Sequence, residues 1–357
     1  MKINRRWLIG VLLIIALAAF AGCSSNDEEL SDREVFEKAF MQNLERHSFE
    51  FSAEMGLIME DLNMPNQALG AYMGAFNNIA MNFDGKIDGE DPVHPEAYFT
   101  GQINSAGLGV ALEMYILDEQ IAIKAPMMAQ ILGDQRLADG YILMDLEEDF
   151  YNQEGYEEMD PEDREALYGM FQQFGEIYME IVEEEFITNN GDTEVTIDGQ
   201  DVDVTEYEIY MGREEIRTVL ESIPELVEDE SFRELVYDAL RISNTEITQQ
   251  EAEEKMDTIQ QDYDQQTVDE LMAELEETLD LDQSSFTMTL FIDQDYRIVK
   301  ENYDVLLVVQ QEQQSFSMQI LGTMEYWNIN GDIDIDAPEF TDQNSVPMQD
   351  LMFAPGF

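Results

Sequence analysis

The sequence predicts an α+β fold with one large antiparallel sheet. Two kinds of segment succeed one another along the chain. In one kind, apolar residues recur at the spacing of an amphipathic helix; in the other, they alternate with polar residues at the period of a half-buried strand. Short turn sequences such as Asp88-Gly89 separate the strand-like runs, and strands joined by short turns pair antiparallel. A single domain over residues 31–340 is the simplest expectation.

Ser/Thr-x-x-Glu capping boxes mark the starts of predicted helices. In such a box, each side chain satisfies a backbone N–H of the other residue. The first box predicts a helix over residues 32–47, and the other two predict that residues 248–279 form two helices with a break near residue 264. The boxes are Ser31 with Glu34, Thr248 with Glu251, and Thr267 with Glu270.

Alternating runs predict the strands. Immediately after the first helix, apolar residues from Phe49 to Met59 alternate with polar ones, which indicates a strand with one buried face. Asp198-Gly199 lies between two alternating runs within residues 194–211 and is the clearest hairpin signal in the sequence. Further strands are expected at residues 79–87, 97–103, 108–117, 121–124, 141–146, 285–292, 297–309, 316–329 and 332–336.

The remaining segments complete the predicted order of helix, strands, helix, hairpin, helices and strands. Asp160 and Pro161 suit the start of a long helix to about residue 182, because Asp caps well and Pro is tolerated at the first helical position. Other helices are expected near residues 213–222 and 231–240. Residues 62–77 are expected to form a loop or short helix, and residues 341–357 a loosely attached tail.

The composition is strongly acidic. The chain has 79 acidic and 17 basic residues, a net charge of −62. Such a charge repels nucleic acid and anionic lipid surfaces, so partners should be cationic or hydrophobic. An alternative is that the acids simply keep the protein hydrated in a salty or alkaline medium. The hydrophobic fraction of 44% is that of a folded protein.

The residues predict no catalytic or metal site and no cofactor, and we therefore expect a protein without enzymatic activity. With only His47 and His94 in the chain, a histidine-based triad or metal site is nearly excluded. His47 is expected at a helix end and His94 in a loop. Calcium is the one metal to consider, at Asp332-x-Asp-x-Asp336 and Asp201-x-Asp203, but this spacing on a strand is more simply a solvated face.

Methionine and phenylalanine are the most suggestive side chains. The chain has 22 Met, a flexible residue that suits surfaces for varied apolar ligands. Several Met and Phe residues lie on the apolar phase of predicted strands, so they either line a ligand cavity or form the core beneath helices. The cavity candidates are Met55, Phe83, Met114, Met288 and Phe316.

The N-terminus has the features of an export signal. A basic start precedes an apolar run from Trp7 to Phe20, too short to span a membrane. Ala21-Gly22-Cys23 follows, and Cys23 is the only cysteine. The tripeptide resembles the lipobox of bacterial lipoproteins, although Phe20 replaces the usual Leu. The resemblance implies removal of residues 1–22, which leaves a net charge of −65, and lipidation of Cys23 by acyl chains such as palmitate. The alternative is a plain cleaved signal peptide.

The same resemblance places the protein on the outer face of the cell membrane, held through its lipid anchor. Residues 23–30 are rich in Ser, Asn and acids and are expected to form a flexible tether. No disulfide is expected, since there is no second cysteine.

Longer phrases resemble uncharacterised lipoproteins of Gram-positive bacteria. These phrases are Leu112-Glu-Met-Tyr-Ile116 with Ile123-Lys-Ala-Pro126, Gly140-Tyr-Ile142, and Val195-Thr-Ile-Asp-Gly199 with Tyr207-Glu-Ile209. That group is in turn similar to the lipoprotein-carrier and mycobacterial lipid-carrier folds. The resemblance implies a curved antiparallel sheet, a half-barrel, with helices on its concave face, and a lipid or acyl chain held between them. The alternative is an envelope lipoprotein that is structural or binds a protein partner.

Overall fold

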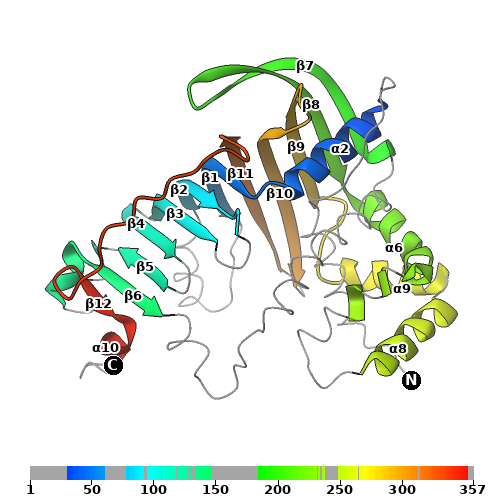
Figure 1. Ribbon diagram of the computed structural model, residues 1–357. Helices are drawn as coiled ribbons and strands as arrows, with labels where there is room; N and C mark the ends of the chain where they lie inside the picture. Colours follow the sequence, from blue (N-terminus) through cyan, green and yellow to red (C-terminus); the bar gives the residue numbers. More distant parts are fainter. Residues whose placement is uncertain are drawn as a thin grey trace. The chain divides into compact units, whose positions relative to one another are not determined.

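The computed structural model describes residues 30–60, 78–91, 95–117, 120–145, 184–237, 248–311 and 314–352, apart from positions 106, 125, 128, 130–133, 231, 234 and 264. Within these residues, twelve strands form an open sheet in the order β12-β6-β5-β4-β3-β2-β1-β11-β10-β9-β8-β7 (Figure 1). Their bounds are β1 Ser48–Glu60, β2 Asn78–Asp88, β3 Glu96–Ser105, β4 Leu108–Leu117, β5 Gln120–Lys124, β6 Tyr141–Asp145, β7 Ile187–Ile197, β8 Gln200–Met211, β9 Ser285–Asp293, β10 Ile298–Gln311, β11 Gln314–Trp327 and β12 Ser345–Pro347.

The large antiparallel sheet is confirmed. Strands β2 to β6 pair antiparallel in sequence order, which is the predicted meander. The hairpin around Asp198-Gly199 is β7 and β8, and both turn residues have positive φ, 46° and 72°. Strand β12 departs from the pattern because it pairs with β6 in parallel. The sequence predicts one domain over residues 31–340, whereas the fold divides into two compact units.

The first unit comprises Met1–Glu45, Glu60–Asn63 and Pro161–Gln319. Its helices in the described part of the chain include α2 (Asp32–Leu44), α6 (Arg213–Glu228), α8 (Gln249–Asp262) and α9 (Gln265–Glu276). Helix α2 contacts β10 and β7 (Figure 1), and its Phe36 and Phe40 are completely buried. From the sheet, Ile209, Met288 and Leu290 join the same core, each 0% exposed. One face of β8 to β10 is thus the floor of a hydrophobic core.

The helix starts follow the predicted caps at two of three places. Ser31 Oγ accepts from the Glu34 N–H, and the Glu34 carboxylate accepts from the Ser31 N–H. The same reciprocal pair joins Thr248 and Glu251 ahead of α8. The predicted break between two helices is also present, because α8 ends at Asp262 and α9 begins at Gln265. Thr267 lies inside α9 instead of capping it.

The second unit comprises Arg46–Met59, Met64–Asp160 and Ile320–Phe357. Two expectations at its C-terminal end are wrong. Residues 332–341 form no regular element instead of a strand. The predicted loose tail contains β12 and helix α10 (Met348–Met352), and Val346 and Leu351 pack with Leu137 and Ile142 in a buried cluster. Val346 is buried because β12 pairs with β6, which puts Val346 in register with Ile142.

Several expectations lie outside the described residues. They are the signal sequence and Cys23, most of the tether, the loop at 62–77, the helix at 160–182 and His94. Within the described part of the chain, none of the helices combines the length and hydrophobicity of a membrane span.

Candidate functional site

The strand register gathers apolar side chains on one face of the second unit. Met55 lies directly opposite Met81, and Phe99 lies directly opposite Met114. Because alternate residues of a strand share a face, this apolar face runs without interruption from β1 across to β6. Its members include Phe49, Phe51, Ala53, Met55, Met81, Phe83, Ile87, Phe99, Ile103, Leu112, Met114, Ile116, Ile121, Ile123 and Ile142.

Two glycines let phenylalanine rings lie close to the sheet. A Cβ on Gly85 would lie only 2.6 Å from the Phe51 ring, and one on Gly101 would overlap the Phe83 ring. Each ring therefore fills the space above a glycine of the neighbouring strand. The Phe51 ring also packs against Phe99, with centroids 5.8 Å apart. This part of the apolar face is consequently broad and lined by aromatic carbon.

Burial of the apolar face decreases toward one end. Phe51 is 7% exposed, whereas Met55, further along β1 (Ser48–Glu60), is 39% exposed. Met81, Phe83 and Met114 are half-buried. The face is therefore neither a closed core nor a fully exposed surface.

Three of the five predicted cavity residues share this face, and two lie elsewhere. Met55, Phe83 and Met114 are on the apolar face of the second unit. Met288 is 0% exposed in the core of the first unit, where it packs beneath helices, as the alternative interpretation of the sequence expects. Phe316 is half-buried on β11, in the part of that strand that belongs to the first unit.

The opposite face of the second unit carries a tyrosine cluster that the sequence analysis missed. The rings of Tyr98 and Tyr115 lie 4.7 Å apart, and Phe340 packs edge-on against Tyr115 and Tyr141. The Glu113 carboxylate accepts hydrogen bonds from the Tyr141 hydroxyl at 2.9 Å and the Tyr115 hydroxyl at 3.4 Å. Burial, followed by Glu113, raises the pKa of Tyr115 to about 12. The segment before β12 covers this cluster, so its role is structural.

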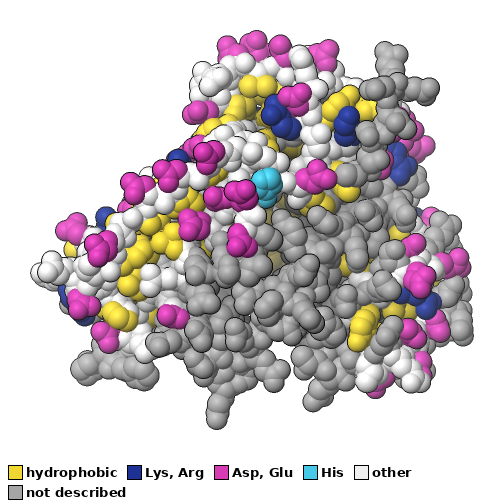
Figure 2. Space-filling view, in the orientation of Figure 1, with side chains coloured by type: hydrophobic (Ala, Val, Ile, Leu, Met, Phe, Trp, Pro, Cys, Tyr) yellow, Lys and Arg dark blue, Asp and Glu magenta, His cyan; other side chains and the backbone are white. Residues whose placement is uncertain are grey.

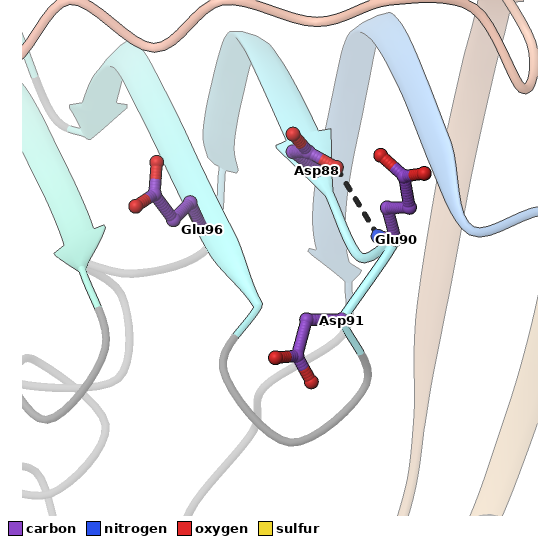
Figure 3. A pocket seen from close by; sticks show the side chains of 4 residues that line it. All are labelled: Asp88, Glu90, Asp91 and Glu96. Atoms are coloured by element: carbon purple, nitrogen blue, oxygen red, sulfur yellow. Dashed lines mark hydrogen bonds between the residues drawn. The ribbon is translucent and has the colours of Figure 1, made fainter.

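A pocket of about 370 Å³ lies where β2 turns toward β3, lined by Asp88, Glu90, Asp91 and Glu96 (Figure 3). Asp88 is already engaged, because its Oδ1 accepts from the Ser48 hydroxyl at 3.0 Å and the Glu90 N–H at 3.1 Å. Among the described residues, no group of His, Cys, Asp or Glu is arranged to hold a metal ion. This pocket is acidic, unlike the apolar cavity that the sequence predicts.

Basic side chains are few on the visible surface, and acidic ones are scattered over it (Figure 2). Several basic groups are committed to structural contacts. Arg213 pairs with Glu276 at 2.6 Å and Arg217 with Asp269 at 2.8 Å, which ties α6 to α9. The Arg46 guanidinium lies 3.7 Å from the centre of the Tyr326 ring. These cations stabilise the fold and do not form an anion-binding array.

Comparisons with known proteins give distant likenesses. No protein-family model matches the chain, and no curated protein does. A crystal structure of LprF from Mycobacterium bovis aligns over 86% of this chain and 96% of its own, with 10% identity and a TM-score of 0.35. A beta-barrel-like protein of the domain of unknown function DUF1849 from Brucella abortus covers 79% and 99%, with 8% identity and a TM-score of 0.19. Neither likeness is close enough to assign the chain to a family.

Proposed function

We propose that this protein is a membrane-tethered, extracytoplasmic lipoprotein that binds a hydrophobic ligand, a lipid or acyl chain, and catalyses no reaction. One observation carries the ligand part of the proposal. The apolar face of the second unit is continuous over at least six strands, yet half-buried side chains line it and Met55 is 39% exposed. Apolar surface that a fold leaves partly open is typical of ligand and partner sites.

The chemistry of the face suits a flexible hydrocarbon chain. Methionines such as Met55, Met81 and Met114 adapt their shape to different apolar groups. Phe51 and Phe83, seated over glycines, add flat aromatic area. Each methylene removed from water on such a surface contributes about 0.8 kcal/mol. We therefore expect the affinity of this face for a ligand to depend on the length of the ligand's hydrocarbon chain more than on its headgroup.

The tether part of the proposal rests on the sequence. Cys23 directly follows Ala21-Gly22, and seven residues separate it from Ser31, the cap of α2. The eight backbone steps from Cys23 to Ser31 reach at most about 29 Å when fully extended. Lipidation of Cys23 would keep the first unit close to the membrane surface.

A second candidate function is an envelope lipoprotein that is structural or binds a protein, with no small-molecule ligand. Two observations favour it. Met288, predicted to line the cavity, is fully buried in a packed core, and the pocket at the β2–β3 turn is lined by carboxylates.

Binding of a fluorescent fatty-acid probe separates these functions. The protein tested is the mature chain with Cys23→Ser, purified in soluble form. We expect Met114→Ala to weaken probe binding at a stability cost below the roughly 2 to 5 kcal/mol of a packed core site. Met288→Ala is the matched control and should cost stability within that range while leaving probe affinity unchanged. Absence of probe binding in the parent protein would favour the second candidate.

The anchor is tested separately in the cells that make the protein. Full-length protein with Cys23→Ser should be released from membranes or keep its signal sequence. A Ser24→Ala variant is the control and should fractionate as the parent does. If the Cys23→Ser protein is processed and still sediments with membranes, the lipid anchor is not at Cys23.

A further inference from the structure

A β-bulge isolates an Asn-Gly step on the edge strand β7. Asn189 pairs with Tyr207 of β8, and the next pair in the ladder is Gly191 with Glu206, so Asn190 has no ladder position. Within the described part of the sheet, β7 pairs on one side only, with β8. Asn190 is exposed, Gly191 has φ of 94°, and a Cβ at Gly191 would meet no atom within 4 Å. Asn190 therefore lies outside the ladder, and the space beside Gly191 is open on the side where a Cβ would stand.

We propose that Asn190 is a site of spontaneous succinimide formation and deamidation. The Gly191 backbone nitrogen gives its proton to water and bonds to Cγ of Asn190. The Cγ–Nδ2 bond then breaks as Nδ2 takes a proton from water, and ammonia leaves. Water then adds to one of the two ring carbonyls, and the ring nitrogen recovers a proton as the ring opens. The product is aspartate or isoaspartate, and water is the only co-reactant. Glycine favours the attack because it has no Cβ to obstruct its nitrogen.

The bonds that hold this step are exposed. The Gly191 N–H donates to Asn189 Oδ1 at 2.8 Å, and Asn190 Nδ2 donates to Glu206 Oε1 at 2.9 Å. Asn189 is exposed and Glu206 is half-buried, and both hydrogen bonds are open to solvent. Water therefore replaces these bonds at little net cost. Neither bond is part of the β7–β8 ladder. The Gly191 nitrogen therefore becomes free to attack without loss of the hydrogen bonds that pair β7 with β8.

Asn330-Gly331 provides an internal comparison because the same dipeptide is held rigidly there. The Asn330 N–H donates to the Ser48 carbonyl at 2.6 Å, and Asn330 Oδ1 accepts from the His47 N–H at 3.0 Å. The Gly331 N–H donates to the Asn328 carbonyl at 3.0 Å, and a Cβ at Gly331 would overlap the Asn328 side chain. Attack at this step requires the whole turn to open.

Conversion at Asn190 has a predictable structural effect. The new carboxylate would face Glu206, where the amide now donates a hydrogen bond, and like charges at that distance repel. Isoaspartate would also lengthen the backbone beside Asn189, whose Nδ2 donates to Asp32 at the start of α2. The modification should therefore loosen the docking of the first turn of α2.

Peptide mapping by mass spectrometry tests the proposal on the folded mature chain, incubated in mildly alkaline buffer prepared with heavy-oxygen water. Incorporation of heavy oxygen reports conversion at each Asn-Gly step. We expect Asn190 to convert at least about tenfold faster than Asn330, a difference of about 1.4 kcal/mol in barrier. The same chain in denaturant should convert both steps at similar rates. Asn190→Gln, which cannot close the five-membered ring, is the control and should remain unmodified.

Two results would overturn the proposal. One is equal or slower conversion at Asn190 than at Asn330 in the folded chain, when the denatured rates are similar. The other is conversion at Asn190 only in denaturant. The consequence is tested by hydrogen exchange: Asn190→Asp should speed exchange of the first turn of α2 relative to Asn190→Gln, and unchanged exchange would exclude the loosening.

Discussion

Tyr263 supplies the hydrogen bond that Pro224 removes from helix α6. Pro224 lies inside the helix and has no N–H, so the carbonyl of Leu220, four residues earlier, loses its helical donor. The Tyr263 hydroxyl, from the short connection between α8 and α9, donates to that carbonyl at 2.8 Å in a buried position. Burial, followed by the nearby Glu221 carboxylate, raises the pKa of Tyr263. A proline inside a helix is tolerated here because a residue from another segment donates to the carbonyl that the proline leaves without a helical partner.

We expect Tyr263→Phe to lower the free energy of unfolding by about 1 to 3 kcal/mol, the cost of leaving a buried carbonyl without a donor. Combining it with Pro224→Ala gives the test, because an alanine at that position would restore the helical N–H that Leu220 lacks. In that background, Tyr263→Phe should cost clearly less in denaturant unfolding. An equal cost in both backgrounds would show that Tyr263 acts only by packing.

Position 101 must be glycine because the Phe83 ring lies directly over it. A Cβ there would lie 2.5 Å from the Asn82 carbonyl oxygen and would overlap Phe83. We expect Gly101→Ala to destabilise the protein by roughly 1 to 3 kcal/mol, as overpacking does. Gly56→Ala on β1 is the matched control, since its nearest neighbour would be 3.9 Å away. That variant should unfold at the same denaturant concentration as the parent or slightly above; equal losses in both would exclude the ring contact as the cause.

At the scale of the element, β10 contains a bulge that changes which side chains reach the core. Ile298 pairs with Ile292 and Lys300 with Phe291, so the pairing register shifts by one residue between them. Beyond the bulge, Glu301 lies opposite Leu290, is 1% exposed, and its carboxylate accepts from the Tyr303 hydroxyl. Without the bulge, strict alternation would put Glu301 on the face opposite to that of Ile298. The register shift instead puts Glu301 on the same face as Leu290, so the burial of Glu301 could not be predicted from alternation alone.

The C-terminal strand β12 completes a small core. Val346 is 0% exposed and packs with Leu137, Ile142 and Leu351. We expect Val346→Ala to cost roughly 2 kcal/mol, from two lost methyl groups and the cavity they leave. Pro347→Ala, at the exposed neighbouring position, should cost little. Thermal unfolding of both variants checks this, and a silent Val346→Ala would support the loose tail that the sequence predicts.

At the scale of the whole molecule, net charge opposes compactness. The full chain carries −62, and removal of residues 1–22 makes this −65. Local pairs such as Arg297 with Asp293, 2.7 Å apart, neutralise only a small part of it. Self-repulsion of this size destabilises the compact state, and salt screens it.

We therefore expect the melting temperature of the mature chain to rise from low salt to about 1 M NaCl, where the screening length is about 3 Å. Sodium sulfate also strengthens apolar burial, so NaCl is the appropriate salt for the measurement. Arg217→Gln removes a positive charge that pairs with Asp269 and so increases the net negative charge. The melting temperature of this variant should therefore rise more steeply with NaCl concentration. A melting temperature that stays flat or falls would mean that the charge is compensated locally.

The sequence by itself determined the local features of this protein. Capping boxes, the Asp-Gly hairpin and period-two alternation depend on neighbours within a few residues, and they placed α2, the start of α8, the β7–β8 turn and the β2–β6 meander correctly. The export signal and Cys23 are equally local in sequence, and their role in anchoring stays a prediction. The sequence also limited the chemistry, since two histidines and one cysteine leave few choices.

Tertiary structure decided what depends on register and long-range contact. Met55, Phe83 and Met288 look alike in sequence, yet pairing puts the first two on a half-buried face and the third in a closed core. Phe83 lies over Gly101, which belongs to a different strand. Val346 is buried because β6 lies beside it. Side-chain alternation predicts which residues of a strand share a face, but it does not predict what packs against either face. The burial of each side chain is therefore decided only when the sheet has assembled.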